Sequence, residues 1–361
     1  MRTAQTQGSK PVCRLQSMPA RSAHRDMGTE GFFKPELEPG KGLGGICLGA
    51  RVQEILAIMQ RHPEVFSNVE VKFAEDGSSD LLIECPDIGL NVICRSRDQR
   101  VRLLELYRPR DFTVLFCDVP CCGPSFVPTF PAIYHRLGPA MPGTYRDDMQ
   151  MYFLEYPGVT FMFPIPREFA HNLNLTGKLP DGTTPVAVRM LIHPVHDVLG
   201  NAPPPLPPDC LYMEPVRVTL DGTMTFEIRG CHLDCRSSTP QDVVGQLGPP
   251  SSIMQKRVDK LRIHAKQTTG CAQYFFNYRD LGIDILFDAR QHSIRKLLMH
   301  TNCPEHVDFN DYSKCNFRLA LPGRTVCNDA SVDIGPDTRW AEIESIMGVP
   351  EGGKPLIHAD R

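Results

Sequence analysis

Three carboxylates in the C-terminal part of the chain are the first candidates for chemistry. Asp284, Asp288 and Asp308 could form an acidic cluster that holds a cation or transfers a proton. Residues 283–287, however, alternate apolar side chains with polar ones, as in a strand with one face in water. Asp284 and Asp288 fall on that water-facing side. We therefore expect solvated charges at these positions and no catalytic or metal site.

Fourteen cysteines and twelve histidines offer further ligands for a metal ion. Two clusters stand out, at residues 117–122 and 231–235, but the paired Cys-x-x-Cys spacing of structural zinc sites is absent. His193 and His196 are separated by Pro194, which spoils a helical pairing, so we expect surface histidines. The sequence thus indicates reduced, mostly buried thiols, as in a cytosolic protein, with no metal or other cofactor.

Motifs that define common enzyme classes are also absent, including the nucleophile elbow, the Walker A loop and the dinucleotide fingerprint. Residues 42–45 (Gly-Leu-Gly-Gly) precede an expected helix, whose N-terminus could bind phosphate, but no strand leads into them. A net charge of −3 gives no attraction for nucleic acid. No apolar run approaches the roughly 20 residues that span a bilayer. We expect neither an enzyme nor a nucleic-acid-binding or membrane-spanning protein.

The elements that position these residues belong to a sequence pattern of one helix and several strands, which occurs more than once along the chain. Its fuller copy is a capped helix from Thr239 that stops at Gly248, followed by strands that include residues 274–278 and 282–288. An earlier copy starts with a capped helix at Thr129, stops at Gly138 and continues into two strands. Repeated units of this kind are more typical of scaffold proteins than of enzymes with a single pocket.

The pattern predicts an α+β fold of tandem repeats, each with one helix packed on a short antiparallel sheet and the last repeat truncated. The expected parts are a disordered basic extension (1–41), a helix-plus-four-strand repeat (42–110), a second repeat (111–238), a third (239–336) and an incomplete fourth (337–361). The second repeat carries a Pro-rich insertion over about 166–211 and then an extra hairpin. Its proline run at 202–208 should form a stiff, extended loop.

The fourth helix is expected from Asp337, with Trp340, Ile343 and Met347 facing inward and Gly348 as its stop. Too few residues follow it to build strands of its own. Since exposing such side chains forfeits roughly 1.5–3 kcal/mol each, we expect this helix to dock on the sheet of a neighbouring repeat.

Aromatic side chains at Tyr274, Phe276 and Tyr278 alternate on one side of a strand. They could form a platform on which bases stack, but packing across strands in a core explains them better.

The motifs at residues 259–264, 274–278, 281–288 and 300–302 form a specific combination. In this combination the chain resembles the phagosome assembly factor family, and weaker matches extend the resemblance from about residue 43 to 350. The resemblance does not say whether the motif residues serve the structure or an interaction. These residues are Tyr274, Phe275, Phe276, Asn277, Tyr278, Gly282, Asp284, Phe287, Asp288, His300, Thr301 and Asn302.

The resemblance implies a non-enzymatic autophagy factor. By this resemblance, its partner is a WD40-type β-propeller protein, and the complex is recruited from the cytoplasm to the phagophore assembly site through phosphoinositides. Lys256, Arg257, Lys260 and Arg262 form a small basic patch, and each charge near an anionic membrane is worth about 1 kcal/mol. Four basic residues bind an anionic membrane only weakly. We therefore expect the partner to supply membrane recognition.

An alternative hypothesis is a lipid- or small-molecule-binding protein in membrane trafficking. Its pocket would lie between a helix and a concave sheet, where the apolar alternation of residues 159–163 meets Tyr152 and Tyr156.

Overall fold

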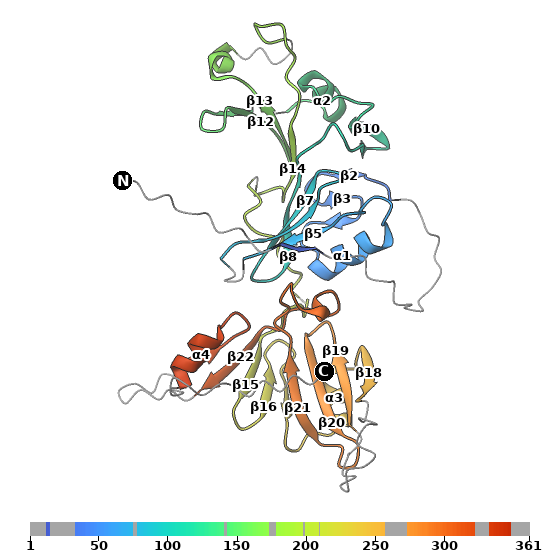
Figure 1. Cartoon of the computed structure of the whole chain (residues 1–361), viewed down its shortest axis with the longest axis vertical. Coiled ribbons are helices and arrows are strands. Elements are labelled where there is room, and N and C mark those ends of the chain that lie inside the picture. Colours follow the sequence, from blue (N-terminus) through green and yellow to red (C-terminus); the bar gives the residue numbers. More distant parts are fainter. Residues whose placement is uncertain are drawn as a thin grey trace. The chain divides into compact units, whose positions relative to one another are not determined.

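The computed structural model describes residues 12–14, 33–74, 78–140, 143–172, 178–197, 199–208, 210–256, 273–321 and 332–347. The chain divides into two compact units, unit 1 (residues 1–208) and unit 2 (residues 209–361). Figure 1 shows the elements of each unit.

Unit 1 is built on a nine-stranded sheet in the order β1-β5-β6-β7-β8-β14-β13-β12-β11, and every neighbouring pair in it is antiparallel. Its strands are β1 (Val12–Arg14), β5 (Glu70–Lys72), β6 (Leu81–Cys85), β7 (Leu90–Arg95), β8 (Arg100–Leu106), β11 (Thr144–Arg146), β12 (Met151–Tyr156), β13 (Val159–Pro164) and β14 (Arg189–Ile192).

Along β6 and β7, buried and half-buried residues alternate, so one face of the sheet belongs to the core and the other is partly open. Helix α1 (Val52–Arg61) buries its apolar stripe, as its spacing predicts. The sulfur of Met59 on this stripe lies 4.0 Å from Sγ of Cys85 on β6. The open face is therefore the one opposite α1.

Helix α2 (Phe130–Leu137) has the ends that the sequence predicts. The Thr129 hydroxyl accepts the N–H of Ala132 at 3.3 Å, and Gly138 ends the helix with φ of 91°. The ring centroid of Phe130 lies 6.4 Å from that of Tyr152 and 6.0 Å from that of Phe163, so α2 packs on β12 and β13.

Smaller elements complete unit 1. They are a three-stranded sheet of β2 (Leu37–Glu38), β3 (Gly42–Leu43) and β4 (Ile46–Cys47), a hairpin of β9 (Val114–Phe116) and β10 (Val119–Cys122), and a 3-10 helix η1 (Arg167–Asn172). Two strands, β1 and β2, fall in the stretch 1–41 that was expected to be a disordered extension.

The proline run at 202–208 is held against the sheet of unit 1. The buried guanidinium of Arg100 donates to the carbonyl of Pro204 at 2.7 Å and to that of Gly49 at 2.9 Å. Arg102 also donates to the carbonyl of Gly200. The proline run is thus a loop tied to its own unit.

Unit 2 contains two sheets, of order β17-β16-β15-β22-β23 and β18-β19-β20-β21. All neighbouring strands are antiparallel except β15 and β22, which pair in parallel. The strands are β15 (Val216–Thr219), β16 (Thr223–Phe226), β17 (Cys231–Asp234), β18 (Ser252–Gln255), β19 (Gln273–Tyr278), β20 (Ile283–Asp288), β21 (Ile294–Met299), β22 (Phe317–Leu321) and β23 (Val332–Ile334).

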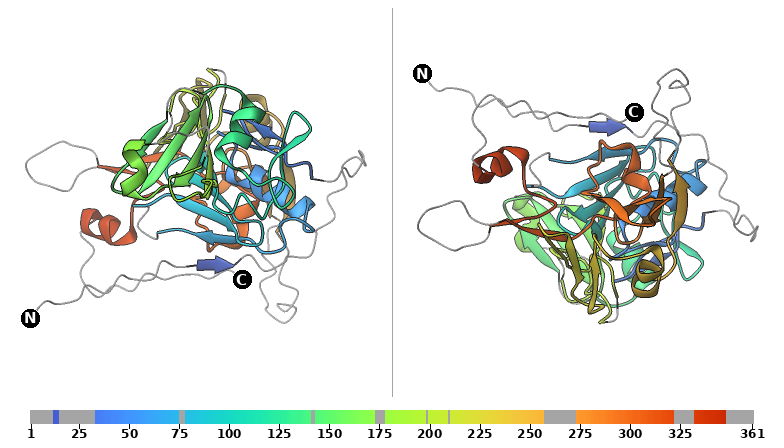
Figure 2. Two further views of the ribbon diagram at one scale, coloured as in Figure 1. Left: turned by 90° about the horizontal axis from the view of Figure 1, so that it is seen from above. Right: turned by 90° about the horizontal axis from the view of Figure 1, so that it is seen from below.

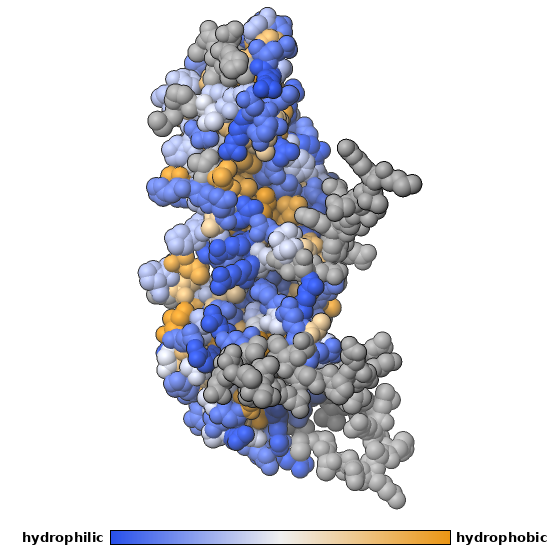
Figure 3. Space-filling view, turned by 90° about the vertical axis from the view of Figure 1, so that its left-hand side faces the viewer, coloured by the Kyte–Doolittle hydropathy of each residue, from blue (hydrophilic) through white to orange (hydrophobic). Residues whose placement is uncertain are grey.

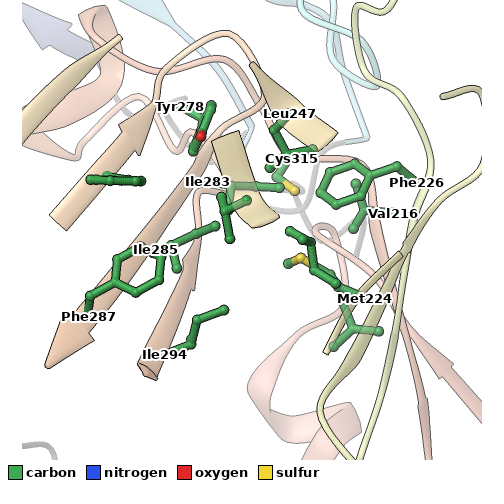
Figure 4. Packing of buried hydrophobic residues seen from close by; sticks show 14 residues of the cluster. Val216, Met224, Phe226, Leu247, Tyr278, Ile283, Ile285, Phe287, Ile294 and Cys315 are labelled. Atoms are coloured by element: carbon green, nitrogen blue, oxygen red, sulfur yellow. The ribbon is translucent and has the colours of Figure 1, made fainter. Parts of the chain in front are cut away.

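One hydrophobic core joins the two sheets of unit 2 to helix α3 (Pro240–Leu247), as Figure 4 shows. The sheets contribute Phe226 and Ile285 among others, and α3 contributes Leu247. The expected capping box is present: Thr239 accepts the N–H of Asp242 at 3.4 Å, and the Asp242 carboxylate accepts the N–H of Thr239 at 2.8 Å.

Helix α4 (Trp340–Met347) lies on the β22 side of unit 2 (Figures 1 and 2). The expectation that Trp340 faces inward is wrong, because 56% of its surface is exposed. Its indole N–H instead donates to Glu344 at 2.6 Å, one turn further along the helix. The aromatic ring therefore lies along the helix surface rather than in a core.

The fold is α+β but dominated by antiparallel sheets. The expected repeat of one helix packed on one short sheet is not confirmed. The expected first and second repeats share one sheet, because β14 pairs with β8 on one side and with β13 on the other. This strand lies inside the predicted Pro-rich insertion. It has only four residues, between Pro185 and Pro194, so no alternation marks it.

No described helix is long and apolar enough to cross a membrane. On the face that Figure 3 shows, hydrophobic residues are scattered among hydrophilic ones. A scatter of this kind is ordinary for a folded protein surface.

Candidate functional site

Four side chains meet around one carboxylate in unit 2, and we call them the Asp284 network: Asn277, Asp284, His300 and Tyr312. Oδ1 of Asp284 accepts from Nδ2 of Asn277 and from the Tyr312 hydroxyl, both at 2.8 Å. Oδ2 lies 3.1 Å from Nε2 of His300, and Nδ2 of Asn277 lies 3.0 Å from the Tyr312 oxygen. Both carboxylate oxygens are thus satisfied.

The aromatic members of the Asp284 network stack on each other. The rings of His300 and Tyr312 are nearly parallel, at 10°, with centroids 3.8 Å apart. Burial, and then the hydrogen bond to Asp284, raise the pKa of Tyr312 well above its ordinary value. The phenol therefore keeps its proton at neutral pH and remains a donor to the carboxylate.

The backbone holds the same region together. We call residues 300–316, which link β21 to β22, the crossover segment. The N–H of His300 donates to the carbonyl of Gly282 at 2.8 Å, and the N–H of Cys315 donates to that of His300 at 2.8 Å. A Cβ on Gly282, whose φ is 67°, would lie 2.2 Å from the carbonyl oxygen of Ser313. Glycine is therefore required where the crossover segment meets the β19–β20 turn.

The expectation that Asp284 and Asp288 are solvated is wrong, since only 6% and 3% of their surfaces are exposed. Strand β20 lies between β19 and β21, and Ile283, Ile285 and Phe287 point into the core of unit 2. Alternation correctly places the two carboxylates on the opposite face. The crossover segment covers Asp284 on that face, so both faces of the strand are buried there.

Asp288 has a local role. Its Oδ1 accepts the N–H of Arg290 at 2.8 Å and that of Gln291 at 3.3 Å, and its Oδ2 accepts from Arg295 at 3.1 Å. These interactions, led by the bond from the Arg290 N–H, lower the pKa of the Asp288 carboxyl. The side chain thus fixes the turn between β20 and β21.

Aromatic motif residues pack in the core, as the sequence favoured. The ring of Phe287 lies 5.4 Å from that of Tyr274 and 4.9 Å from that of Phe276. Tyr278 is buried, and its hydroxyl donates to the carbonyl of Gly248 at 3.0 Å. Phe275 projects from the other face of β19 and is half-buried. These rings are structural and do not form an exposed stacking platform.

The other predicted residues have surroundings of their own. Asn302 is buried with φ of 53°, and Thr301 is exposed. Asp308 lies in the 3-10 helix η3 (Val307–Asn310), 3.4 Å from Nδ1 of His306, so it does not join Asp284. Lys256 is exposed at the end of β18. The remaining members of the expected basic patch, Arg257, Lys260 and Arg262, lie outside the described residues.

Among the described residues, no group of three or more His, Cys, Asp or Glu side chains is placed to hold a metal ion. The described cysteines are free, and several are buried, such as Cys85 and Cys94. His196 is exposed as expected, but His193 is fully buried. Its Nε2 lies 2.9 Å from the Thr160 hydroxyl and its Nδ1 lies 3.0 Å from the carbonyl of Pro194.

The residues that motivated a lipid pocket, 159–163 with Tyr152 and Tyr156, are buried in unit 1. The rings of Tyr156 and Phe161 lie 6.4 Å apart, and Phe130 of α2 packs on the same strands. The space between this helix and the sheet is thus filled by side chains.

The Asp284 network contains an Asp–His pair and a hydroxyl, which are the kinds of group that make up a catalytic triad. In a triad the imidazole lies between the carboxylate and the hydroxyl. Here the Tyr312 hydroxyl donates to the carboxylate itself and the imidazole stacks on the phenol ring. This geometry suits a brace that fixes the crossover segment to β19 and β20.

Sequence reasoning missed a second polar group, on the open face of the unit 1 sheet. Glu84, Asn91 and Glu105 are direct cross-strand partners on β6, β7 and β8. The signal was present in the alternation of these strands, where the polar residues occupy equivalent positions. Only the strand register shows that they form one row.

The model of the family described as Phagosome assembly factor 1 (PHAF1) matches residues 42–361. The chain belongs to the PHAF1 family. This confirms the resemblance stated from the motifs at residues 259–302. A PHAF1 protein of Arabidopsis thaliana is 36% identical over 335 residues, which cover 87% of this chain and 82% of the relative.

PHAF1 proteins of animals are more distant relatives. One of Drosophila melanogaster is 28% identical, over 90% of this chain and 84% of the relative. One of Caenorhabditis elegans is 27% identical, over 91% and 86%. No solved structure matches the chain. The PHAF1 family name supports a role in phagosome assembly and suggests a non-enzymatic one.

Proposed function

We propose that this chain is a non-enzymatic adaptor in autophagosome formation. It binds a WD40-type β-propeller protein and is recruited with it from the cytoplasm to the phagophore assembly site. The observation that carries this proposal is the match of residues 42–361 to the PHAF1 family model. The Asp284 network supports it, because the most elaborate polar cluster of the family motifs braces the fold.

In this proposal the propeller recognises phosphoinositides and the present chain contributes little membrane affinity of its own. Stable attachment of a folded protein to an anionic membrane takes a strong basic cluster or an inserted apolar segment. Lys256 and its three basic neighbours in the sequence form only a small group.

Affinity purification of the tagged chain from starved cells of its source tests the partner. We expect a WD40 propeller protein to be enriched over a tagged, unrelated protein of similar size. Recombinant co-purification of the two chains then establishes direct binding. Recovery of chaperones and metabolic enzymes alone would refute the adaptor proposal.

Flotation with phosphoinositide liposomes tests the division of labour. We expect the isolated chain to stay at the bottom of the gradient and to float when the propeller is added. Robust flotation of the chain alone, lost when Lys256, Arg257, Lys260 and Arg262 are changed to Gln, would show instead that this chain binds the membrane itself.

A further inference from the structure

The open face of the unit 1 sheet carries a hollow of about 480 Å³ that the PHAF1 assignment does not explain. Five polar side chains line it: Glu84, Asn91, Glu105, Tyr107 and Arg189. They come from β6, β7, β8 and β14 and from the residue that follows β8. The volume lies within the range of about 300–1,000 Å³ that is typical of small-ligand sites.

Three hydrogen bonds inside this hollow run from its donors to its own carboxylates. The Tyr107 hydroxyl donates to Oε1 of Glu84 at 3.2 Å, and Nδ2 of Asn91 donates to Oε2 of Glu105 at 3.0 Å. Nη1 of Arg189 donates to Oε1 of Glu105 at 2.6 Å. The hollow therefore still offers acceptor lone pairs on Glu84, Glu105 and Asn91, beside the remaining N–H groups of Arg189.

One acceptor of the hollow lacks a partner. Oδ1 of Asn91 is buried and makes no hydrogen bond with any described residue. Leaving a buried polar atom unpaired is unfavourable, so such atoms are rare and mark a position where a donor is expected. The carboxylates on either side also have unused lone pairs, since each oxygen can accept two hydrogen bonds.

The charge of the hollow favours a cation. Glu84 and Glu105 carry two negative charges and Arg189 one positive charge, which leaves a net charge of −1. Lys72 pairs with Glu84 and lies 3.7 Å from Glu70. The charges of Lys72 and Glu70 cancel, so including both leaves the net charge unchanged. Only 13% of the Glu105 side chain is exposed, and a charge buried to that degree interacts strongly with a neighbouring ion.

The ion pair with Arg189 shows which cation fits. Its guanidinium already approaches Glu105 within hydrogen-bond distance, while half of the arginine side chain remains exposed. A guanidinium has five N–H donors in a plane, enough to reach a carboxylate and an amide oxygen together. Met151 and Val188 complete the lining and can pack on an alkyl stem.

We propose that this hollow binds a guanidinium group on an alkyl chain, held by Glu84, Glu105 and Oδ1 of Asn91. The group belongs either to a free small molecule or to an arginine side chain of a partner protein. The site lies wholly in unit 1, and its occupation does not depend on the adaptor role proposed above.

The test is a titration of the full chain, with ¹³C-labelled methionine methyl groups observed by NMR. The Met151 signal is assigned by its loss in Met151→Leu. Propylguanidinium is compared with propylurea, a neutral molecule of nearly the same shape. We expect at least about tenfold tighter binding of the cation, since a charge-assisted hydrogen bond to a carboxylate is stronger than a bond from a neutral donor. Equal shifts of Met151 with both molecules, or no shift with either, would overturn the proposal.

Variants locate the binding. Glu105→Gln should weaken propylguanidinium binding at least about tenfold. Glu227→Gln, which alters the exposed Arg217–Glu227 pair of unit 2, is the matched control and should change nothing. Should Glu105→Gln fail to fold, Asn91→Ala removes the unpaired acceptor while it leaves both carboxylates in place. Unchanged affinity in a folded Glu105→Gln or Asn91→Ala protein contradicts the proposed site.

A peptide arm distinguishes the two sources. An acetylated Gly-Gly-Arg-Gly-Gly amide is titrated beside the same peptide with citrulline in place of arginine. Tighter binding of the arginine peptide than of propylguanidinium supports a protein partner, and weaker binding supports a small molecule. Loss of the difference between arginine and citrulline would contradict guanidinium recognition.

Discussion

The hydroxyl of Tyr278, the last residue of β19, donates to the carbonyl of Gly248, the residue that ends α3, with 3.0 Å between the two oxygens. The same contact occurs in unit 1, where Tyr156 at the end of β12 donates to Gly138 at the end of α2, also at 3.0 Å. In both cases a strand is fixed to the C-terminus of the preceding helix, where carbonyl groups lack partners inside the helix.

The first prediction concerns this contact. Tyr278→Phe should destabilise unit 2 by about 1–2 kcal/mol, because it leaves the Gly248 carbonyl without its partner at a partly buried position. Hydrogen exchange of the β19 and β20 amide groups measures the effect locally. Tyr274→Phe is the control, since the Tyr274 hydroxyl bonds to His292 at an exposed position. An equal loss of hydrogen-exchange protection in both variants would show that the contact with Gly248 contributes no more than an exposed hydrogen bond.

The second prediction is an alkaline loss of stability. Burial raises the pKa of Tyr278 from 10.0 to about 12 in the folded chain. The folded state therefore favours the neutral phenol, and its contribution to stability is complete below pH 10 and lost as the pH rises toward 12. The free energy of unfolding of unit 2 should fall over that interval. Tyr278→Phe should show a smaller fall, and a fall of the same size would contradict the assignment.

The third prediction uses two glycines of unit 2 with opposite expectations. Gly282→Ala should destabilise by more than about 2 kcal/mol, because its Cβ would meet the Ser313 carbonyl and its φ is positive. Gly245→Ala should stabilise by about 0.5–1 kcal/mol, because this residue is exposed inside α3 with open space around it. Thermal melting of both variants decides the point. A harmless Gly282→Ala would mean that the crossover segment approaches the turn less closely.

The fourth prediction concerns the Asp284 network. Asp284→Ala should cost about 3 kcal/mol, because Asn277, His300 and Tyr312 each lose a buried hydrogen-bond partner. Glu227→Gln is the surface control and should change stability by less than about 1 kcal/mol. The measurement is hydrogen-exchange protection of the β19 and β20 amide groups. If the network instead serves only binding, Asp284→Ala should leave protection unchanged.

The fifth prediction concerns the single tryptophan of the chain, Trp340. Because its ring is mostly exposed, its fluorescence should be close to that of an indole in water and strongly quenched by acrylamide. A blue-shifted emission that resists quenching would show that α4 packs against another surface. Trp340→Phe supplies the background from tyrosine.

Local patterns in the sequence determined the α-helices and many of the longer strands that the structure describes. Capping residues and glycines bound α2 and α3, at Thr129 and Gly138 and at Thr239 and Gly248, because caps satisfy helix ends within a few residues. Alternation of apolar and polar residues marked β5 and β20, and a tight turn marked the hairpin of β15 and β16. These signals depend only on residues two to four positions apart. The family, too, could be recognised from motifs alone.

Tertiary structure decided which faces are buried and which strands are neighbours. Alternation placed Asp284 on the correct side of β20, but only the return of the crossover segment over that side made it a buried residue. The pairing of β14 with β8 and β13 likewise joined two expected sheets into one. The row of Glu84, Asn91 and Glu105 depends on strand register. Each of these features arises from segments far apart in the chain, whose contacts leave no periodic signal in either one.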